Sequence, residues 1–132
     1  MIVDTSALIC VLMNEEEADS FARKMSESSI VMISAATVAE FLQVAQRKYS
    51  ANNYEKARRD AWGLLDEFGI EVLPFDSETA KHAGKAFARY GKGNHPAKLN
   101  FGDCLTYAAV KQCGEPLLFK GSDFDKTDIE LA

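Results

Sequence analysis

The 132-residue sequence contains only three cysteines and two histidines, and this scarcity excludes several kinds of protein. No two of Cys10, Cys104 and Cys113 have the two-residue spacing of a redox or zinc motif, and their number is odd. His82 and His95 do not belong to a His/Cys cluster. A zinc finger and a disulfide framework are therefore excluded, and we expect reduced, mostly buried thiols in a cytoplasmic protein.

The sequence also lacks a long apolar run. A membrane-spanning helix needs about 20 consecutive apolar residues, and no stretch of the chain approaches that length. The segment from Met1 to Met13 is largely apolar, but Asp4 interrupts it and no basic stretch precedes it. This pattern argues against a signal peptide, and we expect no membrane partner.

Positive charge is scarce as well, with 15 Lys and Arg against 20 Asp and Glu and a net charge of −5. Most nucleic-acid-binding proteins are basic because phosphate contacts dominate their affinity, so the overall charge counts against such a partner. The objection weakens if the excess acid is concentrated at a site filled by divalent cations. The remaining composition, 47% hydrophobic and 27% charged, predicts one globular domain over residues 1–132.

Hydrophobic periodicity and capping residues predict strands that alternate with helices. The expected strands are Ile2–Val3, Ile30–Ile33, Glu71–Phe75 and Leu117–Phe119, with Ile129–Leu131 as a last short candidate. The expected helices cover residues 6–13, 18–26, 35–49, 53–68, 77–90 and 103–113, and residues 91–102 form a polar loop. This order predicts an α/β fold, a single short, mostly parallel sheet flanked by helices on both faces, with ligands at the carboxyl ends of the strands.

Four carboxylates fall at the ends of these elements. Asp4 directly follows the first strand, and Asp123 follows the strand at 117–119 by a few residues. Glu40 lies in the second turn of the helix after strand 30–33, and Asp103 is expected to open its helix. All four can meet at one sheet edge, where two like charges about 4 Å apart repel by about 4 kcal/mol at an effective dielectric constant of about 20.

Such a gathering of acids must take up protons or hold a cation. Ligands that are all oxygen atoms favour a hard ion, and we expect one or two Mg²⁺ or Mn²⁺ ions. These ions promote phosphodiester cleavage by lowering the pKa of bound water, polarising the phosphate and stabilising the leaving oxygen. No convincing side-chain nucleophile stands out in the sequence, and this chemistry requires none.

Each acid also has a purely structural interpretation. Asp4 could cap the first helix, and Asp103 could be favoured by the dipole at a helix start. Asp123 could be a turn residue, and periodicity alone favours a solvated Glu40. Taken together with the topology, the four acids outweigh these separate interpretations.

The acidic segments resemble the motifs of PIN-domain nucleases, in the family's order and over nearly the whole chain. The matching segments are Ile2–Leu8, Ala39–Phe41, Asn100–Ala108 and Leu118–Phe124, the last continued by Thr127–Ile129. The subgroup that fits best is the VapC-type toxins of bacterial toxin–antitoxin modules. The resemblance implies a metal-dependent endoribonuclease that acts on RNA, forms a homodimer and is inhibited by a cognate antitoxin protein.

The resemblance also implies roles for individual residues. The metal-binding and catalytic acids would be Asp4, Glu40, Asp103 and Asp123. Supporting groups would be Thr5 or Ser6, Ser122 and, as a further acid, Asp125. Candidates for holding RNA are Arg47, Lys48, Lys92, His95, Lys98 and Lys120, although any one of them could be an ordinary surface residue. Tyr54, Trp62 and Phe87 are candidates for a dimer or antitoxin interface, with core packing as the alternative.

Three rival functions stay open at this point. A receiver-type signalling domain is also α/β, but it usually needs adjacent acids after its first strand, whereas Asp4 is followed by Thr5 and Ser6. A non-catalytic PIN-like module that binds RNA or protein is a second alternative, against which the four intact acids argue. A flap-processing DNA nuclease is the third, but those proteins are longer and carry insertions that this chain lacks.

Overall fold

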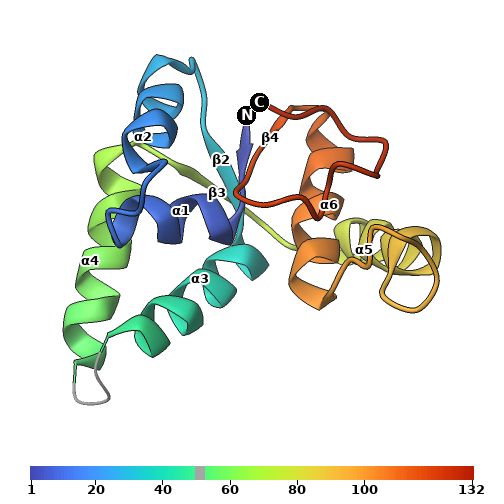
Figure 1. The fold of residues 1–132 in the computed structure, drawn as a ribbon, viewed down its shortest axis with the longest axis horizontal. Coiled ribbons are helices and arrows are strands. Elements are labelled where there is room, and N and C mark those ends of the chain that lie inside the picture. The colour runs from blue at the N-terminus through green and yellow to red at the C-terminus, as the bar shows by residue number, and fades with distance from the viewer. Residues whose placement is uncertain (50–52) are drawn as a thin grey trace.

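A parallel sheet of four strands lies at the centre of the computed structural model, which describes residues 1–49 and 53–132. The strand order is β3-β2-β1-β4, formed by β1 (Ile2–Val3), β2 (Met32–Ser34), β3 (Glu71–Leu73) and β4 (Leu117–Leu118). Ile2 pairs with Met32 on one side and with Leu117 on the other. Because the strands are parallel, their carboxyl ends meet at one edge, opposite the edge where both termini lie (Figure 1).

Six helices cover the two faces of this sheet within the described residues. They are α1 (Thr5–Leu12), α2 (Ala18–Glu27), α3 (Ala35–Lys48), α4 (Tyr54–Glu67), α5 (Ser77–Tyr90) and α6 (Phe101–Cys113). Helices α1 to α4 lie on one side of the strands, and α5 and α6 lie on the other (Figure 1). This arrangement confirms the predicted α/β fold with helices on both faces.

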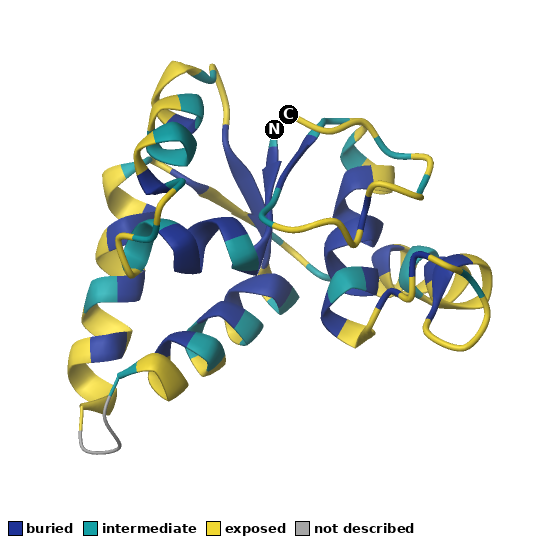
Figure 2. Ribbon diagram, in the orientation of Figure 1, coloured by how far each residue is buried: buried dark blue, intermediate teal, exposed yellow. Residues whose placement is uncertain are grey.

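The core forms two apolar layers, one on each face of the sheet. Val3, Ile33 and Phe41 belong to the layer under α1 to α4, whereas Ile2 and Leu117 belong to the layer under α5 and α6. Neighbouring residues of a strand point to opposite faces, so Ile2 and Val3 serve different layers. Strands β1, β2 and β4 are therefore buried on both sides, as Figure 2 shows for the centre of the molecule, whereas the edge strand β3 is largely exposed.

Two helices begin directly after a strand because an N-cap residue stands at each junction: Asp4 follows β1, and Ser34 is the last residue of β2. The Asp4 side chain accepts a hydrogen bond from the backbone N–H of Ser6 and caps α1. The Ser34 hydroxyl accepts a hydrogen bond from the backbone N–H of Thr37 at 3.1 Å and caps α3. These tight junctions place the first turns of α1 and α3 at the carboxyl edge of the sheet.

Three predicted strands differ from those in the structure. The strand expected at 30–33 is shifted to Met32–Ser34, because β1, its partner, begins only at Ile2. The strand expected at 71–75 ends at Leu73, since the next residue is a proline without an N–H. The last strand is reduced to one bridge between Leu117 and Leu131.

A fourth correction concerns the candidate site. Asp103 does not open its helix, because α6 begins at Phe101 with Asn100 as its N-cap. The Asn100 side chain accepts a hydrogen bond from the N–H of Asp103 at 3.0 Å, and Asp103 accepts one from the N–H of Asn100 at 2.7 Å. This reciprocal pair is a capping box, and it satisfies two backbone donors that Asp103 at the N-cap would leave unpaired.

The cysteines lie as predicted, with Cys10 and Cys104 buried, Cys113 partly buried and all three present as free thiols. Burial raises the pKa of Cys104 to about 11, which makes it an unreactive thiol at neutral pH. Across the described ranges, no helix combines the length and the apolar character needed to cross a membrane.

The position of Phe41 generates a stability prediction. Its ring is 0% exposed in the layer under α1 to α4, so we expect Phe41→Ala to lower the free energy of unfolding by about 3–5 kcal/mol. Phe87→Ala is the matched control, because that ring is 49% exposed on α5 and its removal should cost about 1 kcal/mol or less. Urea denaturation measures both, and equal losses would contradict this placement of the core.

Candidate active site

A cavity of about 280 Å³ lies at the carboxyl edge of the sheet, and it contains all four predicted acids. Asp4 comes from the β1–α1 junction, and Asp123 comes from the segment after β4. Glu40 reaches the cavity from α3, and Asp103 from α6. The remaining lining residues are Thr5, Ser6, Ile9, Val44, Asn100, Phe119, Lys120 and Phe124. Residues that are far apart in the sequence thus supply one acidic pocket.

Asp4 is the most rigidly held of the four acids, with only 7% of its surface exposed. Its Oδ2 accepts hydrogen bonds from the Ser6 backbone N–H at 2.9 Å and from the Ser6 hydroxyl at 2.6 Å. Its Oδ1 accepts a hydrogen bond from the Thr106 hydroxyl at 2.7 Å. A buried carboxylate needs such donors in place of water. Asp4 therefore caps α1 and lies in the acidic pocket at the same time.

A chain of buried hydroxyls lies behind Asp4. The Thr106 hydroxyl that donates to Asp4 lies 3.4 Å from that of Thr37, which lies 2.9 Å from that of Ser34. All three residues are buried, so the chain links β2, α3 and α6 without water. The sequence analysis missed it, and the one available signal was that Thr106 follows Asp103 by three residues and shares its helix face.

Glu40 is half-buried and points its carboxylate toward the start of α1. Its Oε2 accepts a hydrogen bond from the Thr5 hydroxyl at 3.0 Å. Burial raises the pKa of Glu40, the Thr5 hydrogen bond opposes this shift, and the charge of Asp4 adds to it. Glu40 is therefore neither the fully solvated residue that periodicity favoured nor a core residue.

Asp103 experiences the charges of the other three acids. Burial raises its pKa to about 6, against the lowering effect of the hydrogen bond from Asn100. The charges of Asp4, Asp123 and Glu40 contribute, after burial, to this raised pKa. The pocket thus accumulates negative charge that its own protein groups do not balance.

Gly102 leaves the space that the Glu40 carboxylate occupies. A Cβ atom built on Gly102 would overlap both carboxylate oxygens of Glu40. A side chain at this position would displace the Glu40 carboxylate, so the glycine before Asp103 allows α3 and α6 to bring their acids into the same pocket. The sequence analysis treated Gly102 only as part of the loop and of the third motif.

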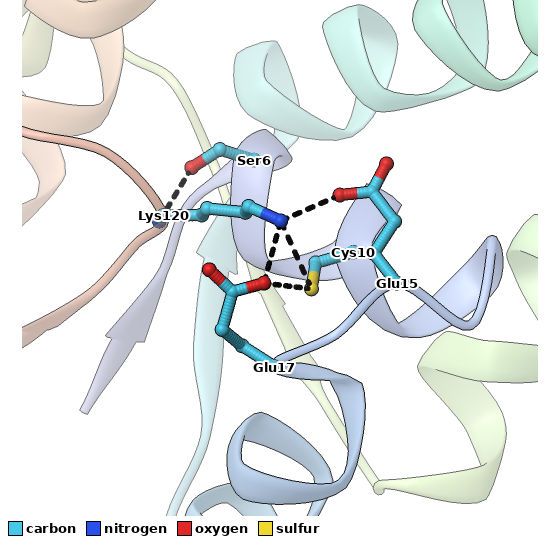
Figure 3. Close-up of polar contacts among 5 residues, drawn as sticks. All are labelled: Ser6, Cys10, Glu15, Glu17 and Lys120. Atoms are coloured by element: carbon cyan, nitrogen blue, oxygen red, sulfur yellow. Dashed lines mark hydrogen bonds and ion pairs between the residues drawn. The ribbon is translucent and has the colours of Figure 1, made fainter.

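Lys120 fastens the segment that carries Asp123. Its backbone N–H donates to the Ser6 hydroxyl at 3.0 Å, and its ammonium donates to Glu15 at 2.9 Å and Glu17 at 2.6 Å, with the Cys10 sulfur at 3.9 Å (Figure 3). These acids raise the pKa of Lys120 and balance its charge. Lys120 lines the pocket, and its ammonium is paired with Glu15 and Glu17.

Two predicted supporting residues, Ser122 and Asp125, and two predicted RNA contacts, Arg47 and Lys48, lie outside the pocket. Ser122 and Asp125 are exposed, and the backbone N–H of Asp125 donates to the carbonyl of Ser122 at 3.3 Å in a turn. Arg47 and Lys48 are exposed in the last turn of α3. The structure therefore brings together the four acids with Thr5, Ser6 and Lys120, and it leaves these four residues apart.

The loop between α5 and α6 holds the remaining predicted residues. Lys92, His95 and Lys98 line a hollow of their own on this loop, away from the acids. The His95 ring packs edge-on against Tyr90 with centroids 5.0 Å apart, and its Nδ1 accepts a hydrogen bond from the backbone N–H of Ala97 at 3.1 Å. His95 thus shapes the loop, whereas Lys92 and Lys98 are exposed.

The donors in the pocket fit a hard divalent cation by their chemistry, because the acidic ligands are all oxygen atoms. Within residues 1–49 and 53–132, no group of three or more acidic, His or Cys side chains is drawn together tightly as a ready metal site. Mg²⁺ retains several of its water ligands, so bridging by water accommodates this wider spacing. A cation would also relieve the charge that raises the pKa of Asp103.

Comparison with known sequences finds one matching family model and relatives that are similar over nearly their full length. The family model described as the PIN domain matches residues 1–130. The chain is 38% identical to Ribonuclease VapC42 of Mycobacterium tuberculosis, an alignment that covers 100% of this chain and 98% of the relative. It is 42% identical to Ribonuclease VapC36 of the same organism, covering 99% of this chain and 92% of the relative.

Solved structures have the same fold. Mycobacterium tuberculosis VapC20, described as a Sarcin-Ricin loop cleaving toxin, superimposes with a TM-score of 0.73 at 16% identity, covering 97% of this chain and 95% of that one. VapBC2 from Rickettsia felis, bound to a DNA fragment from its promoter, gives a TM-score of 0.75 at 13% identity, with 98% and 94% covered. At such low sequence identity, these similarities show a shared fold and nothing more specific.

The position of Gly102 generates a prediction about the pocket. We expect Gly102→Ala to leave the protein folded, because the Glu40 side chain can swing away, but to weaken divalent-cation binding about 10-fold or more. Gly84→Ala is the control, since a Cβ there meets nothing within 4 Å and should slightly stabilise α5. Isothermal titration with Mn²⁺ measures both variants, and unchanged affinity in Gly102→Ala would contradict the packing argument.

The raised pKa of Asp103 generates a prediction about pH. Because the folded-state value of about 6 exceeds the ordinary 3.8, ionised Asp103 destabilises the metal-free protein above pH 6, and this loss disappears below pH 4. Asp103→Asn keeps an oxygen for the cap, so in EDTA it should be more stable than the wild type by about 1–3 kcal/mol at pH 7.5. Urea denaturation in EDTA at pH 7.5 and below pH 4 measures the free energy of unfolding of both proteins. A difference between variant and wild type that does not change with pH would contradict this prediction.

Proposed function

Because this chain belongs to the PIN-domain family, we propose that it is a divalent-metal-dependent endoribonuclease, the toxin of a toxin–antitoxin pair. The observation that carries the proposal is the single cavity that holds Asp4, Glu40, Asp103 and Asp123. Full-length relatives at 36–42% identity that are named VapC ribonucleases support the reaction. Phosphodiester hydrolysis is the reaction that an all-carboxylate metal site serves best.

Asp4, Asp103 and Asp123 would hold one Mg²⁺ or Mn²⁺ ion, and Glu40 would contact it directly or through water. When bound, the ion supplies an activated water nucleophile and neutralises charge on the phosphate and on the leaving oxygen. A second ion would enter with the substrate. Hard cations bind the ionised form of carboxylates, and burial raises the pKa of Asp103 to about 6, so cation affinity falls below that pH.

The protein's own task at this site is orientation. Ser6 and Thr106 occupy fixed positions around the two oxygens of Asp4, which leaves a restricted direction for its remaining lone pairs. Thr5 does the same for one oxygen of Glu40. Lys120 holds the start of the segment that carries Asp123. A ligand set fixed in this way requires little rearrangement when the substrate arrives.

RNA must be held by local positive charge, because the net charge of the chain is −5. Of the basic residues that the sequence analysis singled out, Arg47, Lys48, Lys92 and Lys98 are exposed outside the pocket, and we propose them as contacts to the phosphate backbone. Lys120 is a weaker candidate, since its ammonium is paired with Glu15 and Glu17.

The proposed partners are an antitoxin protein and a second copy of the chain, in the cytoplasm. Solved neighbours described as a toxin–antitoxin complex from Klebsiella pneumoniae and as VapBC2 support an antitoxin. Tyr54 and Trp62 on α4 and Phe87 on α5 are exposed, which supports the interface role predicted for them over core packing.

The direct test is cleavage of total bacterial RNA by purified protein freed of any partner, in Mg²⁺ and then in Mn²⁺. We expect cleavage that EDTA abolishes and that Asp103→Asn lowers by at least about 100-fold, because one acid of the pocket is lost. Asp66→Asn is the matched control, since Asp66 is exposed on α4 away from the cavity.

Two results would contradict the proposed reaction. Cleavage that survives EDTA or Asp103→Asn would show that the activity comes from another source. A folded wild-type protein that binds Mn²⁺ and RNA but cuts neither total RNA nor purified tRNA and ribosomal RNA would favour the non-catalytic binding module.

A further inference from the structure

An exposed aromatic ring lies beside the acidic pocket and has no part in the site described above. Phe101 is 78% exposed, the highest value among the large exposed apolar side chains of the described residues. It is the first residue of α6, directly after the capping residue Asn100 and two residues before Asp103. Neither of the two core layers includes it. Its ring therefore stands in solvent next to the proposed catalytic acids.

Phe101 borders a second hollow, of about 500 Å³, between α3 and α6. The other lining residues are Ala36, Ala39, Glu40, Gln43, Asn100, Gly102 and Leu105. Glu40 and Asn100 also line the acidic pocket, so the two hollows adjoin at these side chains. A molecule whose phosphate lies at the acids can therefore extend directly into the hollow beside Phe101. Figure 1 shows how the first turns of α3 and α6 face each other below the strand ends.

The chemistry of this second hollow suits a planar ring with polar edges. Ala36, Ala39 and Gly102 give its walls little bulk, and Gln43 contributes an exposed amide that can both donate and accept hydrogen bonds. None of the described residues that line it is Lys or Arg, so it offers no positive charge to a phosphate. An unpaired nucleobase has a flat face for an aromatic ring and a hydrogen-bonding edge for an amide.

Helix α3 continues the path away from the acids. Glu40, Gln43 and Arg47 are separated by three and four residues, so they share one face of the helix. Arg47 is exposed near the end of this helix. A nucleic-acid strand along this face meets in order an acid of the pocket, the hollow beside Phe101 and a guanidinium that can pair with phosphate.

We propose that Phe101 and Gln43 form a subsite for the unpaired nucleobase next to the phosphate held at the acidic pocket. The base stacks on the Phe101 ring, and Gln43 hydrogen-bonds to its edge. This inference rests on the proposed endoribonuclease function and adds a residue that selects which phosphodiester is placed at the acids. Stacking of one base on an aromatic side chain corresponds to a loss of about 5- to 150-fold in binding when the ring is removed.

The test compares Phe101→Ala, Phe101→Trp and the control Ile30→Ala on a single-stranded RNA oligonucleotide that contains a mapped cleavage site. Ile30 is also an exposed apolar residue, but it precedes β2 at the opposite edge of the sheet. We expect Phe101→Ala to lower kcat/KM by about 5- to 150-fold, Phe101→Trp to retain it and Ile30→Ala to leave it unchanged.

A matched RNA that lacks the base on one side of the cut separates stacking from a general structural effect. In the wild type, loss of the correct base should lower kcat/KM as much as Phe101→Ala does. The two changes combined should lower kcat/KM no more than either change alone. Gln43→Ala should alter the preference among bases at that position more than it alters the overall rate.

Three results would overturn this subsite in distinguishable ways. A wild-type protein that cleaves no RNA would overturn the endoribonuclease function and the subsite with it. Undiminished cleavage by Phe101→Ala would overturn the subsite alone. A defect of Phe101→Ala that adds fully to the loss of the base, together with a change from dimer to monomer in light scattering, would assign the ring to a contact between copies of the chain.

Discussion

The repulsion among four carboxylates at one sheet edge is the constraint on which the rest of this structure depends. Its effect is visible at Asp103, where burial and three neighbouring charges raise the pKa to about 6. Hydroxyl groups stabilise part of this charge by donating hydrogen bonds, from Ser6 and Thr106 to Asp4 and from Thr5 to Glu40. These donors orient the carboxylates without neutralising them, so the site is suited to a divalent cation.

The fold supplies the rigidity that this charged edge requires. Parallel strands bring their carboxyl ends to one side, and two apolar layers hold the sheet from both faces. Helices that start immediately after β1 and β2 carry Asp4 and Glu40 to the edge without an intervening loop. The capping box of Asn100 sets the position of Asp103, and Gly102 leaves room for Glu40. The same first turn of α6 exposes Phe101 beside the acids, which joins the proposed base subsite to the proposed chemistry.

The sequence was sufficient to predict the fold class and the meeting of the four acids, because both follow from local periodicity and the geometry of parallel strands. It was not sufficient for contacts between distant segments. The hydrogen bond from Thr106 to Asp4 joins residues 102 positions apart, and no local pattern encodes it. The pairing of Lys120 with Glu15 and Glu17 depends on how the α1–α2 connection turns. Phe101 falls in the segment 91–102 that was predicted as a polar loop, and only the structure shows that it begins α6 with its ring in solvent.

The central claim is that the four acids act together as the ligands of a divalent cation, and crystals grown at pH 7.5 with Mn²⁺ test it most directly. Anomalous scattering locates the ion independently of any assay of activity. We expect a strong anomalous peak inside the cavity, within direct or water-bridged reach of Asp4, Asp103 and Asp123, and its loss in Asp103→Asn. A pocket without a peak at saturating Mn²⁺, or a peak bound only outside the four acids, would contradict the claim.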